Sequence, residues 1–193
     1  MLLVFVSRTA GQDPAVAEIL RQKLQDELVA VSRDFNPEAV TRDRNVILVI
    51  VPERLMNFEI GKSMLRPEGE AFLKRYVPVF AEVLCSDAFR SSIESIVVEG
   101  HTDTQQYLGR TAEESEGLNL KLSQDRSMEV VKSALSELAG MNERRSCFLE
   151  KLSATGRGEQ DQEPNAPPEH NRRVIFKIRV KVIDAQTLKV AGR

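Results

Sequence analysis

Two residues of opposite charge, Asp103 and Arg126, have types and settings that suit the binding of a charged ligand. Asp103 follows a short apolar run that ends at Gly100, where a strand is expected to end, and Arg126 lies on the helix expected next. A carboxylate accepts protons from an ammonium group, and a guanidinium binds both oxygens of a carboxylate. Each of the two side chains can therefore bind a ligand group of the opposite charge. Taken singly, Asp103 is better explained as a turn-capping residue, and Arg126 as a solvated helix residue or a partner of Asp125.

Glu99, His101 and Asp103 alternate along the end of the same strand, so their side chains share one side. This arrangement raises the alternative of an enzyme, which needs paired carboxylates or a metal ion in a cleft. The chain has only two histidines, and Cys85 and Cys147 lack the spacing of zinc ligands. The sequence therefore favours a binding site without a metal or cofactor over a catalytic centre.

The composition is typical of a folded domain that needs no metal or disulfide for its stability. The 193 residues are 41% hydrophobic and 29% charged, and the 27 basic and 29 acidic side chains give a net charge of -2. This balance disfavours nucleic acid as a partner, because nucleic-acid binding needs a basic face. Cys85 and Cys147 fit either a disulfide or two buried thiols, and the sequence does not decide between them.

The chain begins with a short apolar run, residues 1–6, and a predicted helix follows it. The run is too short to cross a bilayer, which takes about 20 apolar residues. It is either a first strand or disordered start, or the last part of a membrane helix. An aspartate followed by a proline predicts a helix from Pro14 to about Ser32, and residues 34–44 are predicted to be a polar connector. We expect residues 1–44 to form a membrane-proximal segment with a linker helix.

The chain from residue 45 onward has the element order of an α+β domain. Short β-branched runs predict strands, and broad apolar faces at helical spacing predict helices. The predicted strands are 45–51, 95–99, 148–155 and 173–182, the predicted helices are 67–84 and 119–140, and polar loops are expected at 101–117 and 156–170.

The last predicted strand indicates how the layers are arranged. Its apolar and basic residues alternate, as expected for a sheet with helices on only one face. The order strand, helix, strand, helix, strand, strand predicts a two-layer sandwich with a mixed four-stranded sheet and an extra N-terminal helix. We expect this domain to span residues 45–184 and residues 185–193 to form a tail.

Four segments resemble, in the same order, signatures of OmpA-like domains. They are VEGHTD at 98–103, LNLKLSQDR at 118–126, ATGRGE at 154–159 and NRRV at 171–174. Each segment is short, but the ordered set, spread over residues 46–182, resembles the OmpA/MotB-like family of peptidoglycan-binding domains.

The resemblance implies non-covalent binding of peptidoglycan through the diaminopimelate residue of its stem peptide. Asp103 and Arg126 match the two family positions that hold this residue. Its tip carries an ammonium and a carboxylate on one carbon, which is the ligand chemistry that the two side chains suit. Each charge-assisted hydrogen bond of this kind contributes about 1.5–3 kcal/mol. Arg126 is also expected within two turns of its helix start, where backbone N–H groups favour anions.

Further residues are expected around the same pocket. Thr102 and Leu122 are candidate pocket-wall residues, and Asn119 is expected to cap the helix and to orient the binding loop. The resemblance places either Arg172 or Arg173 in the pocket, paired with the aspartate or with a ligand carboxylate. Arg173 is taken as a candidate binding residue, and a solvated strand face is its alternative.

The sequence departs from the family pattern between Gln105 and Gly117. This stretch is longer and more acidic than the corresponding loop, and it contains three closely spaced glutamates. It is expected to form a lid, to change the preferred stem peptide or to contact a partner. Because a loop insertion moves neither a strand end nor a helix start, Asp103 and Arg126 are still expected to meet.

The apolar run and helix near the N-terminus resemble the MotB branch of the family more than the outer-membrane OmpA and Pal branches. MotB-like proteins lie beside a MotA-like channel and tether it to the wall, and the ZorB subunit of the Zorya anti-phage system is another such protein. The resemblance implies the periplasmic domain of a stator-type subunit anchored in the inner membrane, expected as a homodimer. An outer-membrane tether, a peptidoglycan hydrolase and a protein-interaction module are the alternatives.

Overall fold

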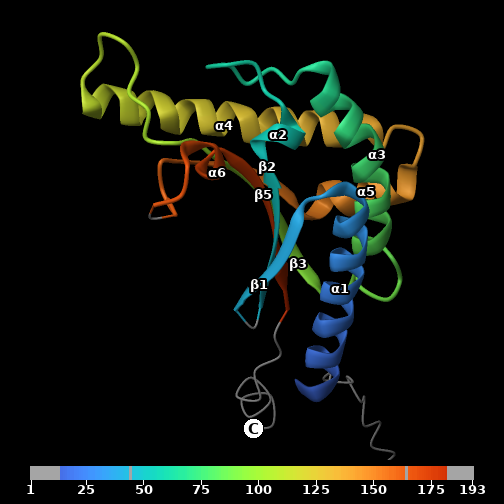
Figure 1. Cartoon of the computed structure of the whole chain (residues 1–193). Coiled ribbons are helices and arrows are strands. Elements are labelled where there is room, and N and C mark those ends of the chain that lie inside the picture. The colour runs from blue at the N-terminus through green and yellow to red at the C-terminus, as the bar shows by residue number, and fades with distance from the viewer. Residues whose placement is uncertain (1–13, 44, 164, 182–193) are drawn as a thin grey trace, which may run out of the picture.

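A sheet with its helices grouped on one side forms the described part of the protein (Figure 1). The structure is a computed structural model that describes residues 14–43, 45–163 and 165–181. The predicted features at residues 1–6 and 185–193 lie outside these ranges. The elements are α1 (Pro14–Phe35), β1 (Glu38–Asp43), β2 (Val46–Pro52), α2 (Glu53–Met56), α3 (Pro67–Leu84), β3 (Ile93–His101), α4 (Ala112–Glu137), α5 (Asn142–Lys151), β4 (Leu152–Gly158), α6 (Pro168–Asn171) and β5 (Arg173–Val180).

The sheet is mixed and has the strand order β1-β2-β5-β3-β4. Strand β5 pairs antiparallel with both β2 and β3, whereas β4 runs parallel to β3. The four predicted strands and the two-layer α+β class are therefore confirmed. Strand β1 is a fifth strand, antiparallel to β2 at the edge of the sheet.

The main core lies between the sheet and the helices. One face of β2, β3 and β5 packs on the helices, with side chains such as Val49, Val98 and Phe176 fully buried. Tyr76 and Phe80 of α3 stack with ring centroids 5.2 Å apart, and Phe80 reaches Phe176 at 5.1 Å. On the opposite face of the sheet a smaller apolar cluster comprises Val46, Leu48 and Ile175.

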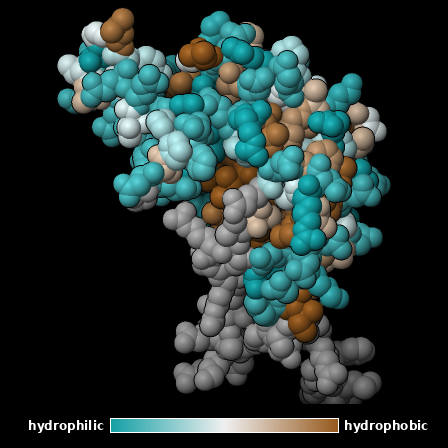
Figure 2. All heavy atoms as spheres, viewed as in Figure 1, coloured by the Kyte–Doolittle hydropathy of each residue, from teal (hydrophilic) through white to brown (hydrophobic). Residues whose placement is uncertain are grey.

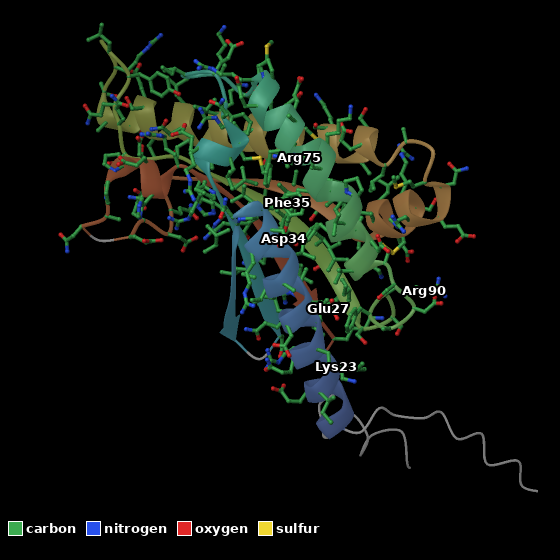
Figure 3. The ribbon with its side chains drawn as sticks, turned by 45° about the vertical axis from the view of Figure 1, so that its right-hand side comes forward. Lys23, Glu27, Asp34, Phe35, Arg75 and Arg90 are labelled. Carbon is green, nitrogen blue, oxygen red and sulfur yellow. A yellow bond between two sulfur atoms is a disulfide. The ribbon has the colours of Figure 1, made fainter. Side chains whose placement is uncertain are left out.

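Helix α1 packs on α3 and contributes to the main core. Leu24 and Leu28, one turn apart, are buried, and the ring of Phe35 meets Tyr76 edge-on with ring centroids 5.5 Å apart. Figure 3 shows Phe35 at the end of α1. The predicted helix is confirmed, with its end at Phe35 rather than Ser32. This apolar face joins α1 to the rest of the fold.

A disulfide between Cys85 and Cys147 joins the end of α3 to α5. The two Cα atoms are 6.0 Å apart, and the bond spans a separation of 62 residues. Of the two alternatives that the sequence left open, the structure has the disulfide.

Helix α4 begins seven residues earlier than predicted. Its N-cap is Thr111, not Asn119, and the Thr111 hydroxyl accepts a hydrogen bond from the backbone N–H of Glu114, whose carboxylate accepts one from the N–H of Thr111. This reciprocal capping box satisfies two backbone donors at the helix start. The segment predicted as a long loop to Gly117 is thus helical from Ala112 onward.

Three other predicted boundaries are wrong. Strand β1 lies within the predicted connector 34–44, and its charged sequence suits an edge strand, which is not buried on both sides. Phe148 lies in α5 rather than in a strand, and β4 begins only at Leu152. The predicted loop 156–170 contains the end of β4 and most of α6.

The surface in Figure 2 is mainly hydrophilic, with hydrophobic side chains in several separate small patches. None of the helices in the described ranges is both long and apolar enough to cross a membrane.

Candidate functional site

One edge of the sheet gathers the ends of two strands and the start of a third. Arg173, the first residue of β5, is paired with both Pro52 of β2 and His101 of β3. Strands β2 and β3 therefore end side by side, on either side of the start of β5. The backbone N–H of Glu53 continues the pairing by donating to the Arg172 carbonyl at 3.1 Å.

A cleft of about 980 Å³ opens at this edge. Its walls come from the strand ends, from the loops that follow β2 and β3, from α4 and from α6. The lining residues include Glu53, Phe58, Ile60, Thr102, Asp103, Tyr107, Leu108, Asn119, Leu122, Arg126, His170 and Arg172. Asp103 and Arg126 line one cavity, as the sequence predicted.

Both carboxylate oxygens of Asp103 already accept hydrogen bonds. Its Oδ2 accepts from Arg172 Nη1 at 2.5 Å, and its Oδ1 accepts from the backbone N–H of Gln105 at 3.1 Å. The second bond closes a turn directly after β3. The side chain is buried, with 10% of its surface exposed, so it has a fixed place on the cleft wall.

Arg126 is a buried cation whose terminal nitrogens make no hydrogen bond to the part of the chain that the structure describes. The residue is 5% exposed, and its guanidinium carbon lies 4.9 Å from the centre of the Phe58 ring. Its Nε donates to the carbonyl of Lys62 at 3.0 Å, and no hydrogen bond joins its Nη atoms to a described residue. Burial lowers the pKa of Arg126, and the negative charge of Glu53 opposes this effect. Two donor groups thus remain available to an anion in the cleft.

The predicted place of Arg126 near a helix start is wrong. Helix α4 begins at Ala112, so Arg126 lies about four turns into it. The backbone N–H groups of the first turn are therefore too far away to bind an anion beside Arg126. The positive charge in this part of the cleft therefore comes from the Arg126 side chain and not from a helix N-terminus.

A short hairpin after α2 covers Arg126. Phe58 and Leu65 form a β-bridge, and the Glu59 N–H donates to the Met64 carbonyl at 2.9 Å. The turn of this hairpin supplies the Lys62 carbonyl that accepts from Arg126. Arg126 therefore lies between this hairpin and the edge of the sheet.

Arg172 and Glu53 connect the two predicted residues through alternating charges. Arg172 Nε donates to Glu53 Oε2, and its Nη1 donates to Asp103. Glu53 Oε1 in turn lies 4.0 Å from Arg126 Nη1. Burial lowers the pKa of Arg172, but its hydrogen bonds to Glu53 and Asp103 raise it more, so the net shift is upward. The charges therefore alternate along these contacts, in the order Asp103, Arg172, Glu53, Arg126.

Asn119 lies inside α4 and joins three segments instead of capping a helix. Its side-chain nitrogen donates to the Gln105 carbonyl at 3.2 Å and to Glu159 Oε1 at 2.8 Å. It therefore holds the loop after β3 against the helix, which confirms that it orients this loop. Thr102 and Leu122 line the cleft as expected. The Thr102 hydroxyl oxygen is buried and has no hydrogen-bond partner in the part of the chain that the structure describes.

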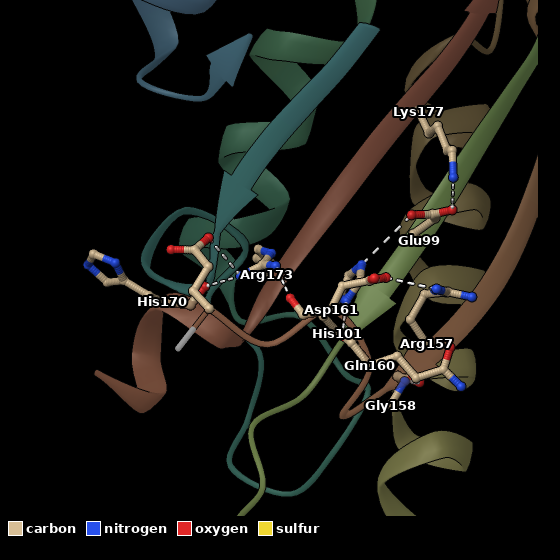
Figure 4. A network of polar contacts seen from close by, with 11 residues as sticks. Glu99, His101, Arg157, Gly158, Gln160, Asp161, His170, Arg173 and Lys177 are labelled. Carbon is tan, nitrogen blue, oxygen red and sulfur yellow. Dashed lines mark hydrogen bonds and ion pairs between the residues drawn. The ribbon is translucent and has the colours of Figure 1, made fainter. Parts of the chain in front are cut away.

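Arg173 does not line the cleft, which corrects its choice as a candidate binding residue. Its guanidinium donates to the carbonyls of Asp161 and His170 at 2.8 and 2.9 Å (Figure 4). It borders a small void of about 10 Å³, which shares Glu53, Arg126 and Arg172 with the cleft. Consecutive residues of an extended chain point to opposite faces. Arg172, directly before β5, lines the cleft, and the side chain of Arg173 therefore points away from it.

Behind the cleft, polar side chains on the open face of the sheet form a second network (Figure 4). Lys177 Nζ donates to Glu99 Oε1 at 3.1 Å, and His101 Nε2 lies 3.8 Å from Glu99 Oε2. His101 Nδ1 lies 3.3 Å from the Gln160 carbonyl. This network holds the segment after β4 beside the strand that carries Asp103.

Glu53 is the site residue that the sequence reasoning missed. It follows the last residue of β2 much as Asp103 follows β3, and this strand-end position was the available signal. The two residues meet only because β5 lies between β2 and β3, and the sequence does not state that strand order. No group of three or more His, Cys, Asp and Glu side chains among the described residues is placed to hold a metal ion.

A mixed sheet covered on one face, with a charged cleft at its strand ends, defines an α+β ligand-binding domain. The chain belongs to the OmpA family, whose sequence pattern matches residues 57–174, more than half of the 193 residues. The predicted resemblance is therefore confirmed. Among curated proteins, none matches the chain.

Solved structures share the fold. A MotB-like protein from Desulfovibrio vulgaris is 22% identical, with a TM-score of 0.64 over 89% of this chain and 98% of that one. The periplasmic domain of Helicobacter pylori MotB is 16% identical, with a TM-score of 0.56 over 80% and 93%. The cell wall anchor of the type VI secretion system from Pseudomonas aeruginosa is 21% identical, with a TM-score of 0.53 over 82% and 97%. At these identities the likeness establishes the fold.

Proposed function

We propose that this domain binds peptidoglycan without cleaving it, through the diaminopimelate residue of the stem peptide, and so anchors a membrane complex to the cell wall. The burial and hydrogen bonding of Arg126 are the main support for this proposal. The residue is 5% exposed, and among the described residues only its Nε has a hydrogen-bond partner, which leaves its Nη groups for a carboxylate in the cleft. A buried cation with free donors binds an anion strongly, because the surrounding protein screens its charge less than water does.

The rest of the cleft suits a peptide with both charges. Asp103 supplies a fixed negative charge on the wall, and Thr102, Asn119 and Leu122 line the same cleft. The volume of about 980 Å³ exceeds that of a single amino-acid side chain, so a longer part of the stem peptide fits.

The arrangement of the domain suits a tether. Helix α1 begins, and β5 ends, at the pole opposite α2 and α6, which border the cleft (Figure 1). A load between the wall and the membrane then passes along the length of the sheet. The disulfide fits an oxidising compartment such as the periplasm.

For the wider role, we propose a periplasmic domain of an inner-membrane, stator-type subunit beside a MotA-like channel, present as a homodimer. The solved structures with this fold include MotB domains and a cell wall anchor, which supports a role at the envelope. A flagellar motor, a Zorya-type anti-phage complex and an outer-membrane tether of the OmpA or Pal type share this wall-binding step. Sedimentation tests the dimer, and a monomer at all concentrations would reject it.

Co-sedimentation with purified peptidoglycan sacculi tests the binding. The proposal expects the wild type to pellet with sacculi, and Arg126→Gln and Asp103→Asn to remain in the supernatant while their circular dichroism is unchanged. Arg90→Gln removes the same charge from an exposed arginine that forms an ion pair with Asp87, and it is expected to bind as the wild type does. Equal pelleting of all four proteins would reject the site.

Incubation with muropeptides separates a binder from an enzyme. We expect mass analysis to recover every muropeptide unchanged after long incubation with the domain. New products that disappear in Glu99→Gln or Asp103→Asn would instead establish the hydrolase alternative.

A further inference from the structure

Among the described residues, the carboxylate oxygen nearest to the Nη atoms of Arg126 belongs to Glu53. Glu53 Oε1 and Arg126 Nη1 are 4.0 Å apart, which is too long for a hydrogen bond, and both residues line the cleft. Glu53 Oε2 is bound by Arg172, whereas Oε1 accepts no hydrogen bond from a described residue. Glu53 Oε1, an acceptor, and Arg126 Nη1, a donor, are thus close to each other but not hydrogen-bonded.

Asp103 is differently placed. Each of its oxygens already accepts one hydrogen bond, from Arg172 and from the Gln105 backbone. Arg172 lies between Asp103 and Glu53 and holds both carboxylates. Among the described residues, the carboxylate oxygen beside Arg126 that accepts no hydrogen bond is therefore Glu53 Oε1.

We propose that Glu53 is a ligand-binding residue: its Oε1 accepts the ammonium group of the diaminopimelate tip while Arg126 Nη1 donates to the carboxylate on the same carbon. This inference rests on the proposed function. The ammonium and carboxylate of one α-carbon are adjacent, and charge-assisted hydrogen bonds are about 2.7–2.9 Å long. A zwitterion lying across the 4.0 Å gap can therefore bond to both side chains.

The same gap makes Glu53 a determinant of specificity. A ligand that brings only a carboxylate to Arg126 also approaches the negative Glu53, and a ligand that brings only an ammonium approaches the positive Arg126. A zwitterion places its carboxylate beside Arg126 and its ammonium beside Glu53. Discrimination then comes from repulsion of the wrong ligand as well as from attraction of the right one.

Three peptides that differ only at the tip test this role. They are L-Ala-γ-D-Glu tripeptides ending in meso-diaminopimelate, in 2-aminopimelate, which lacks the terminal ammonium, and in lysine, which lacks the terminal carboxylate. Calorimetry measures their affinity for the wild type and for Glu53→Gln. Glutamine keeps an acceptor for Arg172 Nε but removes the negative charge beside Arg126. Glu94→Gln, at an exposed residue of β3, is the control for the change in net charge.

We expect the wild type and Glu94→Gln to prefer diaminopimelate to 2-aminopimelate by at least about tenfold, the worth of one charge-assisted hydrogen bond. In Glu53→Gln this preference is expected to fall at least about fivefold, with 2-aminopimelate bound as well as before or better. An unchanged preference, or an equal loss of both ligands, would overturn the role of Glu53 while leaving wall binding intact. Failure of the wild type to bind the diaminopimelate peptide would instead overturn the proposed function.

Discussion

Gly100 of β3 lies directly under the backbone of Ser123 in α4, so closely that a Cβ atom on Gly100 would be 2.1 Å from the Ser123 carbonyl oxygen. The Ser123 hydroxyl also accepts a hydrogen bond from the Gly158 N–H at 2.8 Å. This contact sets the distance between the helix and the sheet. Because Arg126 lies three residues further along α4, the contact also fixes the depth of its guanidinium in the cleft.

Gly100→Ala is therefore expected to lower the free energy of unfolding by about 1–3 kcal/mol, since either the helix or the strand must shift. The shift is also expected to weaken peptidoglycan binding by displacing Arg126. Urea unfolding and sacculus co-sedimentation measure the two effects. Gly117→Ala is the matched control, because a Cβ there meets no atom within 4 Å. In a helix this change is expected to stabilise by about 0.5–1 kcal/mol, and a loss of stability as large as that of Gly100→Ala would contradict the account.

Neighbouring arginines at the start of β5 are expected to have different roles. Arg172→Gln removes the cation shared by Glu53 and Asp103, and it is expected to weaken sacculus binding strongly. Arg173→Gln removes hydrogen bonds to the Asp161 and His170 carbonyls, and it is expected to raise hydrogen exchange in residues 159–171 with a smaller effect on binding. The reverse pattern would show that Arg173, not Arg172, serves the ligand.

The strand and helix pattern of the core could be read from the sequence because its signals are local. Alternation along β5 and the apolar runs of β2 and β3 specify strands whatever their neighbours are. The shared pocket of Asp103 and Arg126 was implied by the resemblance to OmpA-like domains, since the first residue follows β3 and the second lies on the next helix.

Other features depended on signals that compete or act at a distance. Asn119 has the residue type of an N-cap, but the Thr111–Glu114 capping box, whose N-cap lies eight residues earlier, sets the helix start. Asn119 bonds instead to Glu159 across 40 residues. Strand β1 carries few apolar residues, so nothing in its pattern marks a strand. The part played by Glu53 depends on the order of strands in the sheet, which no local pattern states.

Reduction of the disulfide is expected to destabilise the domain. The bond between Cys85 and Cys147 closes a separation of 62 residues, for which loop entropy in the unfolded chain predicts a contribution of about 4 kcal/mol. Urea unfolding with and without reductant measures it. A Cys85→Ser/Cys147→Ser double variant is expected to match the reduced wild type and to ignore reductant. Equal stability of the oxidised and reduced proteins would contradict the prediction.

Glu99 is expected to make the stability of the fold depend on pH. Burial raises the pKa of its carboxyl, but His101 and a hydrogen bond from Lys177 lower it more, so the net pKa lies below the ordinary value of 4.5. The ionised group is then favoured in the folded state. Its stabilisation is present above pH 4.5 and is lost as the pH falls through the lowered pKa.

Glu99→Gln is therefore expected to lower the free energy of unfolding at pH 7 by about 1–2 kcal/mol, as for a partly buried hydrogen bond between charged groups. The difference from the wild type is expected to shrink at pH 3, where the carboxyl is protonated in the unfolded chain and increasingly so in the folded one. Urea titrations at several pH values measure it. Glu94→Gln, on an exposed residue of the same strand, is expected to match the wild type throughout. A deficit in Glu99→Gln as large at pH 3 as at pH 7 would show that the residue acts by packing rather than by charge.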